Sequence, residues 1–232
     1  MLEYWQHLHW PGILADWIHE GSLVFDVGAN IGKMTYAYLG LGARVIAVEP
    51  QAVCVEELQH RFRENERVEI VHAACGSKVG QGIITTYGHG STISTMVPDY
   101  YWGSGGPWQG TPRDGREAVT VTTLDALIEQ YGMPAWVKVD VEGYELEVLQ
   151  GLSRFVPLSF EFHPYWAQRA VECMQRLLEI DAEVEFNHTE GEQLQYVNGW
   201  TDCNALAREV ERLNAQHGRT YFGNIYARRK VR

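Results

Sequence analysis

The sequence has few cysteines, no excess of basic residues and no long apolar run. Its four cysteines, Cys54, Cys75, Cys173 and Cys203, form no CxxC pair. This argues against a disulfide framework or a structural zinc site and favours the reducing cytoplasm. The net charge of -11 argues against binding to nucleic acid through its phosphates. No apolar run approaches the roughly 18 residues that span a bilayer, and residues 1–10 lack the features of a signal peptide. We therefore expect a cytoplasmic protein with neither nucleic-acid nor membrane partners.

What is present favours one α/β domain over residues 1–232. The chain is 45% hydrophobic and 21% charged, which is ordinary for a globular protein. Short runs rich in Val, Ile and Phe are typical of strands buried on both faces of a parallel sheet, and the segments between the early runs have helical length. The runs are 23–27, 44–48, 68–73, 136–139 and 158–162, and the expected helices include 11–20, 52–65 and 202–217. Runs 183–188 and 220–227 predict two further strands and an antiparallel ending to the sheet.

One segment breaks this alternation. Residues 87–117 are rich in glycine and carry Tyr and Trp side chains without periodicity. Long loops of this kind in compact domains are usually functional or disordered. We expect a lid or an insertion that binds an acceptor molecule.

A glycine-rich turn follows the first predicted strand, in the run Asp26-Val27-Gly28-Ala29-Asn30-Ile31-Gly32. Glycines between a strand and a helix let backbone N–H groups approach a ligand closely, although a tight turn without a ligand would look the same. The dinucleotide fingerprint G-x-G-x-x-G places Asn30 and Lys33 where it needs glycines, so the NAD interpretation is weak. A Walker A loop does not fit the spacing either.

The acids around this turn favour an adenosine ligand without a diphosphate, and S-adenosylmethionine is such a ligand. Asp26 ends the first strand, where a carboxylate suits the ammonium group of that cofactor. Glu49 ends the second strand about 20 residues further on, where an acid can accept both ribose hydroxyls. Pro50 follows and cannot continue the strand ladder.

Charged residues also cluster at the ends of two later strands. Lys138 and Asp140 share one face of the fourth strand by alternation, and Glu142 and Glu145 follow in the turn. The fifth strand carries Glu161 and His163. All reach the sheet edge at which ligands bind in open α/β sheets.

Two chemistries are open for these residues. A histidine beside carboxylates can act as a general base, so we predict that His163 takes the proton of an acceptor while Glu161 or Asp140 orients it. A metal site of Asp140, Glu161 and His163 is chemically possible. Nothing in the spacing demands it, and we predict none.

These motifs resemble the FkbM family of methyltransferases. The resemblance rests on residues 26–32, on Val48-Glu49-Pro50, on 121–125 and, most specifically, on 138–151, which reads Lys-Val-Asp-Val-Glu-Gly-Tyr-Glu-Leu-Glu-Val-Leu-Gln-Gly. It implies a Rossmann-like class I methyltransferase fold and an S-adenosylmethionine cofactor. It further implies O-methylation of a small hydroxyl-bearing metabolite such as a sugar or polyketide. The cofactor contacts that it implies are Asp26, Gly28, Asn30, Gly32, Glu49, Pro50, Ala74 and Asp140.

Two other functions remain open at this point. One is an oxidoreductase with an NAD-type cofactor. The other is a binding module that keeps the fold and the S-adenosylmethionine site without turnover.

Overall fold

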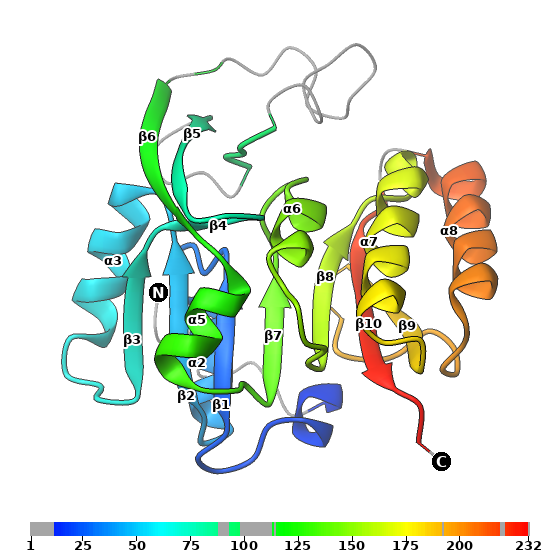
Figure 1. Cartoon of the computed structure of the whole chain (residues 1–232), viewed down its shortest axis with the longest axis horizontal. Coiled ribbons are helices and arrows are strands. Elements are labelled where there is room, and N and C mark those ends of the chain that lie inside the picture. Colours follow the sequence, from blue (N-terminus) through cyan, green and yellow to red (C-terminus); the bar gives the residue numbers. More distant parts are fainter. Residues whose placement is uncertain are drawn as a thin grey trace.

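The computed structural model describes residues 12–87, 93–97, 113, 115–191, 193–218 and 221–231 (Figure 1). Its centre is a seven-stranded sheet in the order β3-β2-β1-β7-β8-β10-β9. The first five strands of this order pair in parallel, and β10 runs antiparallel to both of its neighbours. The strands are β1 (Leu23–Val27), β2 (Arg44–Glu49), β3 (Val68–His72), β7 (Trp136–Val139), β8 (Leu158–Phe162), β9 (Val184–Glu190) and β10 (Gly223–Arg229). The predicted class I methyltransferase fold, with its antiparallel ending, is confirmed.

Helices cover both faces of the sheet because both faces are apolar. Side chains alternate along a strand, so neighbours in β1 belong to different cores. Phe25 packs in one core with Val148 and Met174, and Val24 packs in the other with Tyr38 and Leu58. The helices are α2 (Lys33–Gly40), α3 (Ala52–Phe62), α5 (Leu124–Tyr131), α6 (Glu145–Gln150), α7 (Ala167–Ile180) and α8 (Cys203–His217), with 3-10 helices η1 (Gly12–Asp16) and η2 (Pro164–Trp166).

A second, three-stranded sheet stands above the carboxyl ends of the central strands and was missed by the sequence analysis (Figure 1). Its order is β4-β6-β5, where β4 is Ala74–Cys75, β5 is Gly80–Thr86 and β6 is Gly115–Thr122. Residues along much of β6 alternate between buried and exposed positions, so this strand lacks the continuous apolar run used to find the others. Residues 115–117, predicted as loop, belong to β6. Of the predicted lid 87–117, the rest lies outside the described residues except for 87, 93–97 and 113.

The predicted helix over 11–20 is wrong in type and length. The chain forms the short 3-10 helix η1, and the N–H of Ile13, in its first turn, donates to the carbonyl of Leu194. The other predicted elements differ from the observed ones only at their ends, as in α3, which stops at Phe62 instead of residue 65.

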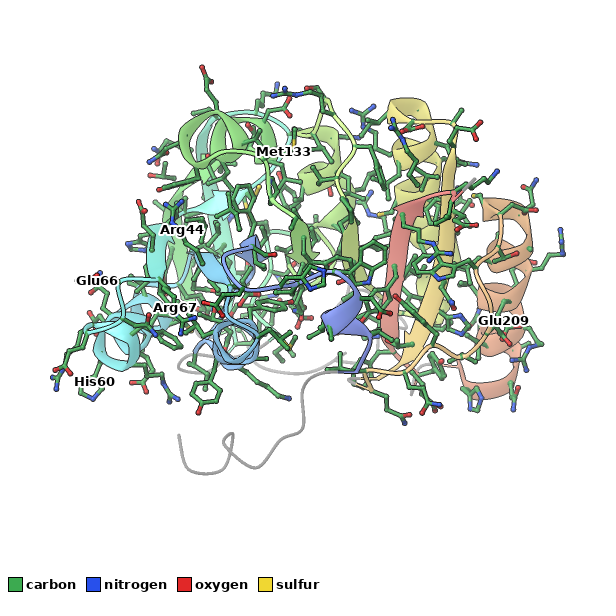
Figure 2. The ribbon with its side chains drawn as sticks, turned by 90° about the horizontal axis from the view of Figure 1, so that it is seen from below. Arg44, His60, Glu66, Arg67, Met133 and Glu209 are labelled. Atoms are coloured by element: carbon green, nitrogen blue, oxygen red, sulfur yellow. The ribbon has the colours of Figure 1, made fainter. Side chains whose placement is uncertain are left out.

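Charged side chains cover the amino-terminal edge of the sheet and the surfaces beside it. Arg44, Glu66 and Arg67 are exposed there (Figure 2), and Arg44 lies 3.5 Å from Glu69 in an exposed ion pair. Within the described ranges, no helix has the length and apolar character needed to cross a membrane.

The packing of α2 against α3 depends on Gly32. This residue has a φ of 88°. A Cβ atom there would lie 2.5 Å from Phe62 and 2.8 Å from Leu58. We expect Gly32→Ala to lower the free energy of unfolding by about 1–3 kcal/mol, through backbone strain and overpacking. Urea unfolding measures this change.

The matched control is Gly80→Ala, because a Cβ atom at residue 80 meets nothing within 4 Å. Equal unfolding midpoints for the two variants would contradict the role given to Gly32.

Candidate active site

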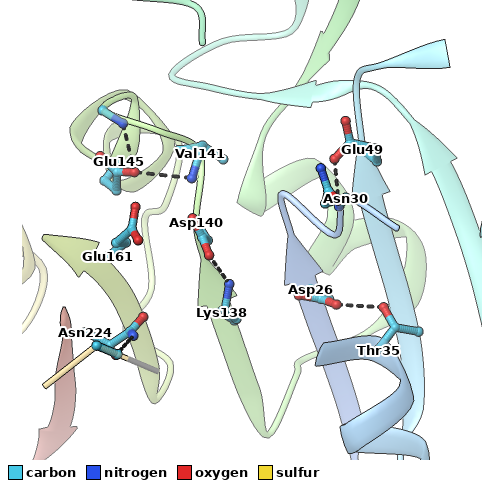
Figure 3. A network of polar contacts seen from close by, with 12 residues as sticks. Asp26, Asn30, Thr35, Glu49, Lys138, Asp140, Val141, Glu145, Glu161 and Asn224 are labelled. Carbon is cyan, nitrogen blue, oxygen red and sulfur yellow. Dashed lines mark hydrogen bonds and ion pairs between the residues drawn. The ribbon is translucent and has the colours of Figure 1, made fainter. Parts of the chain in front are cut away.

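A cavity lies at the carboxyl ends of β1, β2 and β7, beneath the small sheet. Glu49 lies over β2 and Asp140 over β7, with the turn after β1 between them (Figure 3). The lining residues are Val27, Gly28, Asn30, Val48, Glu49, Pro50, Gln51, Ala73, Ala74, Cys75, Ile84, Ser94, Thr95, Met96, Asp140, Val141, Glu142 and Tyr144. Apolar walls and a few carboxylates at strand ends are typical of a small-molecule site.

The structure places most of the predicted cofactor residues at this cavity. Asp26 and Gly32 do not line it. The predicted residues that do line it are Gly28, Asn30, Glu49, Pro50, Ala74 and Asp140.

Glu49 is held by the backbone of two neighbouring turns. Its two carboxylate oxygens each accept one N–H at 2.9 Å, from Asn30 and from Gln51. Asn30 reaches this position with a φ of 48°, a left-handed conformation that asparagine tolerates better than most residues. Burial raises the pKa of Glu49 to about 7, against the lowering effect of the two N–H donors. The Gln51 side chain also hydrogen-bonds this carboxylate and lowers its pKa, and a carboxylate with about four acceptor sites keeps room for a further hydrogen bond.

Asp26 lies below the cavity in a buried polar network. It is 1% exposed and accepts a hydrogen bond of 2.6 Å from the Thr35 hydroxyl. Nearby, the ammonium group of Lys138 donates to Asp140 at 2.5 Å (Figure 3). Burial works against the charged form of Lys138, but Asp140 and Asp26 together raise its pKa. Lys138 and Asp140, which share one face of the strand, therefore form an ion pair.

Gly28 brings the turn after β1 against the turn after β7. It has a φ of 81°, and a Cβ atom on it would lie 1.7 Å from the carbonyl oxygen of Asp140. The N–H of Asp140 in turn donates to the carbonyl of Val27 at 2.9 Å. Glycine is thus required at residue 28 by the packing of the two turns, in addition to any approach of a ligand.

Glu145 organises the turn after β7. Its Oε1 accepts the N–H groups of Val141 at 3.2 Å and Gly143 at 3.1 Å. Burial, followed by the charge of Glu161, raises the pKa of Glu145 to about 7. Glu142, in the same turn, has a φ of 55°. Its carbonyl accepts the Thr95 hydroxyl at 2.6 Å.

Glu161 and His163 meet beside this turn, as their shared strand face predicted. Glu161 Oε2 lies 3.6 Å from His163 Nε2. Burial lowers the pKa of His163, but the carboxylate of Glu161 outweighs it and raises the pKa above its usual value. Burial and the charge of Asp140 raise the pKa of Glu161. The rings of Trp166 and Phe222 lie about the imidazole, with centroids 5.9 Å and 6.1 Å away.

Ile84 of the small sheet was not predicted at the cavity, whereas residues 94–96 belong to the segment 87–117 that was predicted to bind an acceptor. Ile84 and residues 94–96 line the cavity, and Thr95 joins the small sheet to the turn of Glu142. No local pattern marks these residues, because their contacts join segments about 50 positions apart in the chain.

A family model now connects this geometry to a known activity. The model of the methyltransferase FkbM domain matches residues 26–172, which is more than half of the chain. The chain belongs to the FkbM methyltransferase family. It is therefore an S-adenosylmethionine-dependent methyltransferase, and the NAD-type oxidoreductase alternative falls away.

Solved structures of other methyltransferases are similar to this FkbM domain only remotely. A precorrin-6y C5,15-methyltransferase of Geobacter metallireducens GS-15 is 10% identical with a TM-score of 0.47, over 94% of this chain and 86% of that one. An O-methyltransferase of Bacillus cereus in complex with SAH is 12% identical with a TM-score of 0.43, over 90% and 74%. No curated protein sequence matches the chain. Similarity at this level says nothing about the acceptor of this chain.

The raised pKa of Glu145 gives a test of its burial. Between about pH 4.5 and 7 the folded state holds a proton that the unfolded state has released, so the stability due to Glu145 is lost as the pH rises through this range. Glu145→Gln keeps an acceptor oxygen and does not titrate. Relative to wild type, this variant should gain up to a few kcal/mol of stability between about pH 5 and 8.

Urea unfolding at about pH 5 and about pH 8 measures this gain. Glu64→Gln, at an exposed position, controls for the loss of one charge. A pH-independent difference between Glu145→Gln and wild type would contradict the prediction.

Proposed function

We propose that this methyltransferase transfers the methyl group of S-adenosylmethionine to a hydroxyl oxygen of a small metabolite, such as a sugar or polyketide. The observation that carries the proposal is the pair of Glu161 and His163 at the end of β8. It lies beside Asp140, which lines the cavity at the end of β7. A hydroxyl is weakly acidic, so its methylation benefits from a base at the point of transfer.

The cavity suits the two polar ends of the cofactor. Glu49 lines the cavity and, beside the hydrogen bonds it already accepts from Asn30 and Gln51, can accept one from the ribose diol. Pro50 and Ala74 belong to the apolar walls that would contact the adenine ring. Asp140 supplies a carboxylate for the positively charged methionine end. When bound, the cofactor supplies an electrophilic methyl group on a sulfonium.

The protein would act on the acceptor mainly by positioning it and by receiving its proton. The bound cofactor would supply the methyl group for the acceptor oxygen, and the imidazole of His163 would receive the hydroxyl proton. Glu161 stabilises the imidazolium that results, as its effect on the pKa of His163 supports. Asp140 and the walls of the cavity hold the reacting groups in line and keep water away.

The first test concerns Glu49. Ribose hydroxyls donate to the ionised carboxylate, so binding competes with protonation at a pKa of about 7. The affinity for S-adenosylhomocysteine should be constant above about pH 7 and fall by up to tenfold per pH unit below it. Glu49→Ala should weaken binding by about 1.5–3 kcal/mol at high pH, and Glu49→Gln should lose the pH dependence.

Calorimetric titration measures these affinities. The assignment of Glu49 would be wrong if wild type and Glu49→Gln showed the same pH slope.

The second test concerns the base. His163→Ala should lower turnover by about 10²–10⁴-fold, the usual contribution of a general base, with little change in cofactor affinity. Asp140→Asn should impair both. The assay follows labelled methyl groups from S-adenosylmethionine into a pool of hydroxyl-bearing metabolites and identifies the methylated atom.

His60→Ala, at an exposed position on α3, is the control. Turnover at the wild-type rate in His163→Ala would show that His163 is not the base. A methylated nitrogen in the product would overturn the hydroxyl acceptor, and no transfer at all would favour a binding module.

A further inference from the structure

Three side chains beside the cavity converge on one point, and of these Glu142 lines the cavity. Glu142, Glu161 and His163 each offer one ligand atom, and these atoms lie within 4.8 Å of one another. Glu142 comes from the turn after β7, and the other two come from the end of β8. The set of two carboxylates and one imidazole differs from the one considered in the sequence analysis, because Glu142 takes the place of Asp140.

The state of Glu161 is an independent sign of a missing partner. Its Oε2 atom is buried and has no hydrogen-bond donor among the described residues. The imidazole nitrogen of His163, at 3.6 Å, is too far away for a good hydrogen bond. The buried carboxylates Glu49 and Glu145, by contrast, each accept two N–H groups. A buried charged oxygen without a partner is costly, and a bound cation would remove that cost.

The local charge favours a cation as well. Burial and the charge of Asp140 raise the pKa of Glu161, and burial, Glu161 and Asp140 raise the pKa of Glu145. The charges of His163 and Lys138 lower the pKa of Glu161, but the ammonium group of Lys138 is paired with Asp140. The positive groups of S-adenosylmethionine would face Asp140, on the cofactor side, rather than Glu161.

We propose that Glu142, Glu161 and His163 bind a divalent metal ion. Carboxylate oxygens suit Mg²⁺ and Mn²⁺, and the imidazole nitrogen shifts the preference toward first-row transition metals, so Mn²⁺ is the probe of choice. Three protein ligands leave further positions of the ion open to water or to an acceptor oxygen. The role of the ion rests on the proposed hydroxyl methylation, whereas the existence of the site does not.

A metal at this site would change how the acceptor loses its proton. A hydroxyl bound to a divalent ion is more acidic, so it can release its proton to a solvent water and attack as an alkoxide. The imidazole lone pair of His163 would then be a ligand and could not serve as the base. Proton removal by His163 therefore applies to the metal-free protein. Proton release from a metal-bound hydroxyl applies to the metal-bound protein.

The experiment measures Mn²⁺ binding to the chelator-treated full chain without cofactor or acceptor, by electron paramagnetic resonance and calorimetry. Wild type should bind one ion. Glu142→Gln, Glu161→Gln and His163→Gln should each weaken binding by more than about tenfold, and the exposed control Glu64→Gln should leave it unchanged. Binding of S-adenosylhomocysteine by each variant reports that it is folded.

The outcomes separate the two proposals. Absence of Mn²⁺ binding, or equal binding by all three cluster variants and wild type, overturns the metal site and leaves hydroxyl methylation standing if transfer proceeds in chelator. Metal binding that depends on the three residues supports the site even if the methylated atom proves not to be oxygen. A methylated atom other than oxygen would overturn the proposed function and leave the metal site standing.

Discussion

The buried ammonium group of Lys138 is the interaction on which the site depends. It lies on the central strand β7 and its charge acts on both Asp140 and the buried Asp26 on β1. Carboxylates on neighbouring central strands would otherwise repel each other in a medium of low dielectric constant. Losing one partner of such a buried network leaves an uncompensated charge. Lys138 thus allows acids to stand near the carboxyl ends of two adjacent strands, Asp140 at the cavity and Asp26 below it.

Backbone packing sets the positions of these acids. The turns after β1 and β7 touch at Gly28 and Asp140, so close that no Cβ atom fits between them. The turn after β7 is then held from its other side by Glu145 and by the hydroxyl of Thr95. A change at any of these contacts would move Asp140 and Glu142 together. The small sheet is therefore coupled to the site and does more than cover it.

The buried carboxylates of the site differ in how they are satisfied. Burial raises the pKa of Glu49, Glu145 and Glu161 alike. Glu49 and Glu145 are compensated by backbone N–H groups, which hold turns in place. Glu161 has a buried oxygen without a donor among the described residues, which is the observation behind the proposed metal site. A pKa raised by burial therefore does not by itself tell a carboxylate that holds a turn, such as Glu145, from one proposed to bind a ligand, such as Glu161.

The sequence alone determined the central sheet and much of the site. Short continuous apolar runs are typical of strands in a parallel sheet whose two faces are both covered by helices. Acids that follow such strands lie at the carboxyl edge of the sheet, where ligands bind. Tertiary structure decided what local patterns do not encode. It formed the second sheet from half-exposed strands, gave a short 3-10 helix where a longer helix was predicted at 11–20, and placed Asp26 and Gly32 away from the cavity. It also paired Asp140 with Lys138 and brought Glu142 within reach of Glu161 and His163, in a turn with a positive φ that no periodicity predicts.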